Sequence, residues 1–181
     1  MADSVQYPAK YIEPSAFQAR RGKDFSGTVV FTNGCFDLVH PGHVDYLARA
    51  RQLGSRLVLG VNSDASVRRL KGPGRPITSE LDRVAVLSAL ECVDHIMLFD
   101  QDTPLELIRD ISPDILVKGG DWPVQDIVGR EHVLARGGQV LSLPMLPGYS
   151  TTAIIERILA LSRTGETGQN PHLMEPEANG R

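Results

Sequence analysis

Apolar, β-branched runs alternate with helical patterns from residue 28 to residue 162, and this alternation constrains the fold more than any other feature. The runs are continuously hydrophobic rather than alternating, and each is followed by apolar residues at helical spacing. Strands of that kind are buried on both faces, as in a parallel sheet that helices cover on either side. The sequence therefore predicts a Rossmann-like, doubly wound α/β domain with a five-stranded parallel sheet.

The same pattern predicts the bounds of the elements. Strands are expected over residues 28–32, 57–61, 94–99, 114–117 and 139–143. Helices are expected over residues 41–53, from 78 or 79 to 91, from 103 onward, partly over 126–136, and from 150 or 151 to 161. Residues 27–162 would form one domain, after a peripheral N-terminal extension (1–26) that is partly helical around residues 14–21. The tail, residues 163–181, has too few apolar residues to offset its ordering entropy and is expected to be disordered.

Composition narrows the classes of function. The net charge of −3 leaves no excess of cations for a phosphate polymer, which disfavours nucleic acid and membrane surfaces as partners. Two cysteines cannot build a dense disulfide framework, so a reducing compartment is expected. The N-terminus lacks an apolar signal segment, and no apolar run is long enough to span a bilayer. These features predict a soluble, cytoplasmic protein.

The turn that leaves the first strand carries the most informative residues. Ligands of open parallel sheets lie beyond the carboxyl ends of the strands, where this turn is expected. His40 and His43 stand three positions apart across the start of the next helix and can project toward one point, and Gly42 between them leaves room for a ligand. Imidazolium donors beside free helix N–H groups suit a triphosphate. The turn itself adds further candidate nucleotide-binding residues: Asn33, Gly34, Cys35, Phe36 and Asp37.

Other interpretations of this segment stay open. One histidine can cap the helix while the other lies on the surface. Cys35, His40 and His43, with Cys92, can also be read as a metal site, although the spacing matches no familiar zinc pattern. Asp37 either orients the turn or approaches magnesium. The position at a strand-to-helix junction favours the nucleotide interpretation.

A basic run follows the second strand. Five basic and two acidic residues lie between Arg68 and Arg83, in a Gly- and Pro-rich context that suits a lid over a polyphosphate. The alternative is a solvated run of charge. Arg83 either contacts phosphate or pairs with Asp82 or Glu80.

Further candidates follow the fourth and fifth strands. Lys118 ends a buried strand, where an ammonium group needs an anionic partner or must reach the surface. Asp121 either binds a ribose or holds Lys118, and Trp122 either flanks a base or lies in the core. Ser150 or Thr151 both caps the last helix and binds phosphate.

These motifs together resemble the cytidylyltransferase-like, His-x-Gly-His class of nucleotidyltransferases over most of residues 27–160. The resemblance implies a turn at residues 62–64 and a mobile basic loop at residues 68–76. It makes His40, His43, Lys71 and Arg83 the catalytic residues. It also implies a nucleotide-binding role for residues in two later motifs: Lys118, Gly120, Asp121, Tyr149, Ser150, Thr151 and Thr152.

Within that class, the motifs are most similar to the adenylyltransferases of bacterial heptose biosynthesis. Some of these are fused to a sugar kinase, and a chain of 181 residues resembles the stand-alone form. The resemblance implies transfer of AMP from ATP, with Mg²⁺, to a heptose 1-phosphate. The products would be pyrophosphate and ADP-heptose for the lipopolysaccharide core. It also implies a homodimer.

Two other functions remain as alternatives. The first is a cytidylyltransferase acting on a polyol or amino-alcohol phosphate. It is disfavoured by Met145, Leu146 and Pro147, which stand where glycerol-phosphate cytidylyltransferases carry Arg-Thr-Glu. The second is a non-catalytic nucleotide- or metal-binding module. A dinucleotide dehydrogenase is disfavoured because no Gly-x-Gly-x-x-Gly follows the first strand.

Overall fold

The computed structural model describes residues 8–21 and 26–164. It divides into two compact units, residues 1–149 and residues 150–181, which are described separately. The tail expected at residues 163–181 lies outside the described residues from 165 onward. The domain bounds expected at residues 26 and 162 stay predictions.

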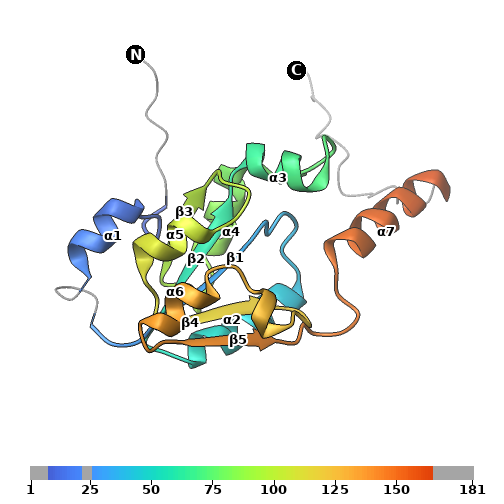
Figure 1. Ribbon diagram of the computed structural model, residues 1–181. Coiled ribbons are helices and arrows are strands. Elements are labelled where there is room, and N and C mark those ends of the chain that lie inside the picture. Colours follow the sequence, from blue (N-terminus) through green and yellow to red (C-terminus); the bar gives the residue numbers. More distant parts are fainter. Residues whose placement is uncertain (1–7, 22–25, 165–181) are drawn as a thin grey trace, which may run out of the picture. The chain divides into compact units, whose positions relative to one another are not determined.

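A five-stranded parallel sheet organises the first unit, in the order β3-β2-β1-β4-β5 (Figure 1). Each strand expected from the sequence is present, within two residues of its expected ends. The doubly wound fold class is confirmed. The strands are β1 (Val29–Gly34), β2 (Arg56–Asn62), β3 (His95–Phe99), β4 (Ile115–Gly119) and β5 (Gln139–Leu143).

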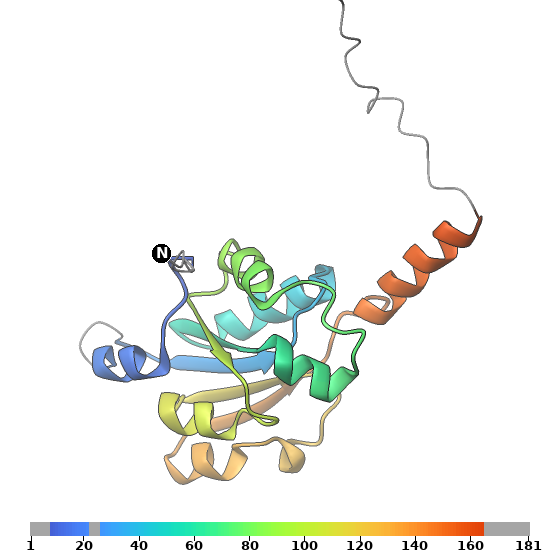
Figure 2. The same cartoon turned by 90° about the horizontal axis from the view of Figure 1, so that it is seen from above.

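Helices cover both faces of this sheet (Figure 2). One buried cluster joins the sheet to α1, α5 and α6, and the other joins it to α2 and α4. The continuous hydrophobicity of the strands follows, because each strand sends side chains into both clusters. The helices of this unit are α1 (Pro14–Arg20), α2 (Pro41–Gln52), α3 (Asp64–Lys71), α4 (Glu80–Ser88), α5 (Leu105–Ile111), the 3₁₀ turn η1 (Val124–Asp126) and α6 (Arg130–Ala135).

Helix α3 corrects the expectation of a turn followed by a mobile loop. Its N-cap is Ser63, whose side chain accepts a hydrogen bond from the Ser66 amide at 3.0 Å. Basic residues fill its last turn, where they complement the negative end of the helix dipole. Only Ser66 and Val67 of this helix are buried, so the sequence has no apolar stripe from which the helix could be predicted. The expected basic loop therefore begins as the end of a helix.

The N-terminal segment is not peripheral. Phe17 of α1 is completely buried, and Ile12 is nearly so. The Ile12 amide donates to the Ile96 carbonyl of β3 at 2.9 Å, so the chain before α1 runs along the edge strand. Ile12 and Phe17 therefore belong to the core, while most of the other residues from 11 to 20 are exposed. The helix predicted around residues 14–21 is present as α1.

The sheet opens between β1 and β4. β1 pairs with β2 from Val29 to Gly34, but it pairs with β4 only at Val30 and Phe31. Beyond these positions the hydroxyl of Tyr46, from α2, reaches the Val117 carbonyl of β4 at 3.4 Å. The direction of winding reverses between these two strands, which is where open α/β sheets bind ligands.

The second unit contains α7 (Thr151–Thr164), which begins as the sequence predicts. The Ser150 side chain accepts a hydrogen bond from the Ala153 amide at 3.0 Å, so Ser150 caps the helix. Among the described residues, no helix has both the length and the apolar character needed to cross a membrane.

Candidate active site

The two histidines after β1 lie against each other. Their ring centroids are 3.8 Å apart, with the ring planes 26° from parallel. His40 is buried and forms the N-cap position of α2, and the proline after it takes the first helical position. No hydrogen-bond partner for the buried Nδ1 atom of either ring is present among the described residues. The two imidazoles therefore occupy one place at the start of α2.

Burial sets the charge of this pair. It lowers the pKa of His40, and it lowers the pKa of His43 to about 4 together with the neighbouring His40 charge. Both rings are therefore neutral at pH 7 in the ligand-free protein. The expectation of imidazolium donors is wrong for this state, because taking a second proton would place charge in a desolvated site. A bound anion would raise both pKa values again.

Close packing around the pair explains the small residues of the turn. A Cβ atom on Gly42 would lie 3.1 Å from the His40 ring and 3.1 Å from the Tyr149 Cβ atom. Phe36 adopts a left-handed conformation with φ of 49°, and its ring centroid is 5.2 Å from that of His43. Gly42 thus makes room for neighbouring side chains, where the sequence suggested room for a ligand.

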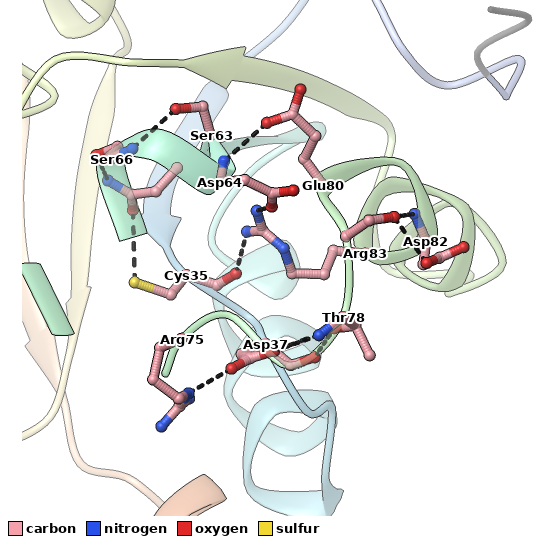
Figure 3. A network of polar contacts seen from close by, with 12 residues as sticks. Cys35, Asp37, Ser63, Asp64, Ser66, Arg75, Thr78, Glu80, Asp82 and Arg83 are labelled. Atoms are coloured by element: carbon pink, nitrogen blue, oxygen red, sulfur yellow. Dashed lines mark hydrogen bonds and ion pairs between the residues drawn. The ribbon is translucent and has the colours of Figure 1, made fainter. Parts of the chain in front are cut away.

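Asp37 holds the segment that precedes α4 (Figure 3). Its buried carboxylate accepts hydrogen bonds from the amides of Ile77 and Thr78, at 2.7 and 2.9 Å, and pairs with Arg75. Burial alone would raise the pKa of Asp37, but the Thr78 amide and the Arg75 guanidinium more than offset burial and the pKa is lowered. Both carboxylate oxygens are occupied, which favours the orienting role over contact with magnesium.

Most of the basic run is already neutralised. Arg69 pairs with Asp102 at 2.8 Å, and Arg75 and Arg83 each have a carboxylate partner. Within the described part of the chain, the side chains of Arg68 and Lys71 have no hydrogen bond or ion pair, and both residues are exposed. The cations left to attract a polyphosphate are therefore two, fewer than the sequence suggested.

Arg83 is completely enclosed. One terminal nitrogen donates to the Cys35 carbonyl at 2.6 Å, and the other donates to Asp64 at 2.7 Å (Figure 3). The alternative pairing with Asp82 or Glu80 is wrong: Asp82 bonds to the Ser79 hydroxyl, and Glu80 accepts from the Asp64 amide. Contact of Arg83 with phosphate stays a prediction, and its side chain has no exposed surface for such a contact.

Lys118 stands at the carboxyl end of β4, beside the opening of the sheet. It is half-buried, and burial lowers its pKa. Its ammonium group lies 5.8 Å from the centre of the Trp122 ring, a cation–π distance. Asp121 is exposed and forms no ion pair with Lys118, and Trp122 is 52% exposed rather than in the core. An anion is the partner that Lys118 lacks among the described residues.

The alternative of a metal site finds no support. Among residues 8–21 and 26–164, no three His, Cys, Asp or Glu side chains lie close enough to hold a metal ion. Cys35 and Cys92 are free thiols, and burial raises the pKa of each.

A cavity of about 550 Å³ opens beside the histidine pair, with mostly apolar walls, and is lined by Val39, His40, Pro41, Val44, Asp45 and Leu146.

Comparison with known proteins identifies the family. The family model described as cytidylyltransferase-like matches residues 31–157, which include the turn, the histidine pair and the end of β4. This chain belongs to the cytidylyltransferase-like family. Membership confirms the resemblance predicted from the motifs, and with it the class of enzyme, a nucleotidyltransferase.

Relatives of this nucleotidyltransferase include proteins named bifunctional protein HldE. The protein of that name from Syntrophotalea carbinolica is 59% identical over 142 residues, which are 78% of this chain and 28% of the relative. The one from Citrifermentans bemidjiense is 58% identical over 132 residues, 73% of this chain and 27% of the relative. The chain thus spans just over a quarter of the length of these relatives.

A solved structure agrees with the fold. A lipopolysaccharide core biosynthesis protein from Thermoplasma volcanium superposes with a TM-score of 0.55 at 28% identity. The match covers 67% of this chain and 98% of that protein. The pantoate–β-alanine ligase of Francisella tularensis superposes with a TM-score of 0.54 at 10% identity, which shows a shared fold alone.

The remaining predicted residues divide between the two units. Asn33 and Gly34 end β1, and Gly120 follows β4 with a positive φ of 105°. The other four are Tyr149, whose ring centroid is 6.3 Å from that of His40, and Ser150, Thr151 and Thr152, which open the second unit.

The sequence interpretation did not single out three polar residues that make contacts around the predicted site: Tyr46, Asp64 and Thr78. Tyr46 follows His43 by one helical turn on a face that is otherwise apolar, and this spacing was an available signal. Asp64 and Thr78 stood inside segments treated as a turn and as a helix start, so their partners could not be inferred.

Proposed function

We propose that the chain is an adenylyltransferase that transfers AMP from ATP to a heptose 1-phosphate, releasing pyrophosphate and ADP-heptose for the lipopolysaccharide core. The stacked His40–His43 pair at the start of α2, beside the opening between β1 and β4, carries this proposal. The motif resemblance to heptose adenylyltransferases supports the substrates. So do the names of the HldE relatives and of the lipopolysaccharide core protein.

The reaction needs no protein nucleophile. A phosphate oxygen of the sugar phosphate attacks the α-phosphorus of ATP in line, the bond between that phosphorus and the bridging oxygen breaks, and pyrophosphate leaves with the electron pair. The attacking oxygen is already anionic, so no general base is required. Cys35 would not compete, because burial raises the pKa of its thiol. Catalysis then rests on positioning and on stabilisation of charge.

The histidine pair would stabilise the phosphoryl oxygens. Each neutral ring can donate one N–H group to an anion, and the anion would raise the pKa of His43 from about 4. The amides at the start of α2 add dipolar stabilisation. Lys71 would bind the β- and γ-phosphates. The resemblance implies phosphate binding for Ser150 and Thr151 as well.

Mg²⁺ would enter with ATP as part of the substrate. The Asp37 carboxylate is fully engaged by Arg75 and by two amides, and the described residues contain no group of three His, Cys, Asp or Glu side chains that could hold a metal ion. Phosphate oxygens and water would therefore be the ligands of the cation, which would neutralise part of the charge on the phosphates.

A cytidylyltransferase acting on a polyol or amino-alcohol phosphate is the second candidate, because the family model carries that name. Leu146 argues for ATP: it lines the apolar cavity beside His40, at a position where glycerol-phosphate cytidylyltransferases carry a polar residue. A homodimer and a cytoplasmic location are further expectations from the resemblance and from the composition.

Pyrophosphate release tests the proposal directly. The purified chain is incubated with Mg²⁺ and either ATP or CTP, together with heptose 1-phosphate, a hexose 1-phosphate or glycerol 3-phosphate. We expect pyrophosphate from ATP with heptose 1-phosphate, and much less from the other pairs. Release only with CTP and glycerol phosphate would favour the second candidate, and binding without release would indicate a non-catalytic module.

A further inference from the structure

Arg83 joins three separate parts of the first unit. It lies on α4, donates to the Cys35 carbonyl just after β1, and donates to Asp64 in the first turn of α3 (Figure 3). Asp64 is also tied to α4 through its amide, which donates to Glu80 at 2.7 Å. The side chain of Arg83 has no exposed surface, whereas that of Asp64 is 24% exposed, so the ion pair is only partly screened by solvent.

The chemistry of a guanidinium group suits this place. A buried cation is costly unless it is paired and hydrogen-bonded. One carboxylate and one carbonyl satisfy the two terminal nitrogens of Arg83, whereas its buried Nε atom has no partner among the described residues. The guanidinium is planar and rigid, so its two terminal nitrogens hold their partners at a fixed separation. A lysine at this position would present one mobile ammonium group and could not hold both partners in the same way.

The two partners of Arg83 lead to two groups of the site. The Cys35 carbonyl begins the turn that ends, five residues later, at the His40 ring. Asp64 starts the helix that ends at the unpaired Lys71. A shift of either partner would therefore displace the histidine pair or the lysine.

We propose that Arg83 is a positioning residue, which fixes the turn after β1 against α3 through Cys35 and Asp64 and does not contact the triphosphate. This inference rests on the proposed function for its kinetic test, but not for its structural one. It replaces a role in phosphate binding with a role in placing the groups that bind phosphate.

A double-mutant cycle separates the two roles. Arg83→Met and Asp64→Asn each remove the tie, so each should lower kcat by about tenfold to a hundredfold, on the scale of a small misplacement of reacting groups. The double variant should be little slower than Arg83→Met alone, because both substitutions break one interaction. Asp82→Asn is the control. It removes the same negative charge as Asp64→Asn, but from the residue that precedes Arg83 on α4, and it should keep near-normal turnover.

A phosphate contact predicts another pattern. Arg83→Met would then weaken inhibition by pyrophosphate and raise KM for ATP, while Asp64→Asn would leave kcat nearly unchanged. Either that result, or independent and multiplicative losses in the double variant, would overturn the proposal.

Hydrogen exchange gives a readout that does not need turnover. In Asp64→Asn, amides of residues 34–39 and of α3 should exchange faster together, while amides in β2 and β3 keep their rates. A substitution that merely destabilises the protein would speed exchange throughout the sheet, and unchanged exchange in the turn would contradict the proposal. If the wild-type chain releases no pyrophosphate, the proposed function fails, and this measurement still decides the role of Arg83.

Discussion

His40 and His43 stack with their ring centroids 3.8 Å apart, and the shared burial keeps both rings neutral. A site that binds a polyanion would be expected to carry a positive charge in the ligand-free protein. Here the nearest rings carry none, and the exposed Lys71 stands at the end of a different helix. A bound triphosphate would raise the pKa of both rings, so the protonation of the site depends on its ligand as well as on pH.

The first prediction concerns the pKa of His43. In the ligand-free protein, its ring resonances should titrate with a midpoint of about 4, because burial and the neighbouring His40 oppose protonation. A non-hydrolysable ATP analogue with Mg²⁺ should raise this pKa. Ring assignments come from comparison with His43→Asn. A free-state midpoint near the ordinary value of about 6.5 would contradict the burial argument.

The same lowered pKa has a consequence for stability. In the unfolded chain His43 binds a proton at about pH 6.5, whereas in the folded protein it does so only at about pH 4. The unfolded state therefore holds more protons between these values, and the contribution to stability is present above pH 6.5 and lost as the pH falls toward 4. Urea unfolding at several pH values should show this loss, and it should be smaller in His43→Asn than in the parent.

Turnover tests the role of His43 directly. His43→Ala should lower kcat by roughly a hundredfold to a thousandfold, the scale for losing one donor to the transition state. The fold should survive, because His43 is only half-buried at the edge of the core. His132→Ala is a matched control, since that ring lies on α6 and contacts Ser112. Near-normal turnover in a folded His43→Ala protein would remove His43 from the mechanism.

Much of the fold could be predicted because buried strands and helices require hydrophobic residues at regular positions in the sequence. The segment around Val58 and Leu59 is apolar on both sides of the strand, and such runs marked every strand of the sheet. Helix α3 has no such hydrophobic pattern. It is stabilised by the Ser63 N-cap and by basic residues in its last turn, and not by an apolar stripe. Phe17 was missed for a related reason: one buried side chain makes no period.

The site was predicted as a set of residues rather than as an arrangement. His40 and His43 could be placed together because their spacing across a helix start is local. The partners of Asp37 and Arg83 could not be inferred, since they lie 41 and 48 positions away along the chain at most. The number of cations available to bind phosphate was also mispredicted. A count of basic residues treats an arginine that is paired with a carboxylate and an unpaired lysine alike.

The neutralised and the free cations of the basic run should behave differently. Lys71→Ala should raise KM for ATP about tenfold, as expected for losing one charge-assisted contact to phosphate. Arg69→Ala makes a similar truncation two residues earlier, but Arg69 is already paired with Asp102 and Asp100. It should therefore change KM for ATP by much less, because exposed pairs of this kind contribute little. Equal effects of the two substitutions would show that the pairing on the structure does not decide which cation binds.

Gly42→Ala should separate stability from activity. Alanine is the better helix former, by about 1 kcal/mol in a helix interior, so helix propensity alone would stabilise α2. The added methyl group would lie 3.1 Å from the His40 ring on one side and 3.1 Å from the Tyr149 Cβ atom on the other, and one of them must move. We expect the melting temperature to change little and kcat to fall about tenfold, because the displaced ring is in the site. Gly74→Ala is the control for packing, since a Cβ atom there meets nothing within 4 Å, and it should leave the melting temperature nearly unchanged. Normal kcat in Gly42→Ala would mean that the His40 ring need not keep its stacked position for catalysis.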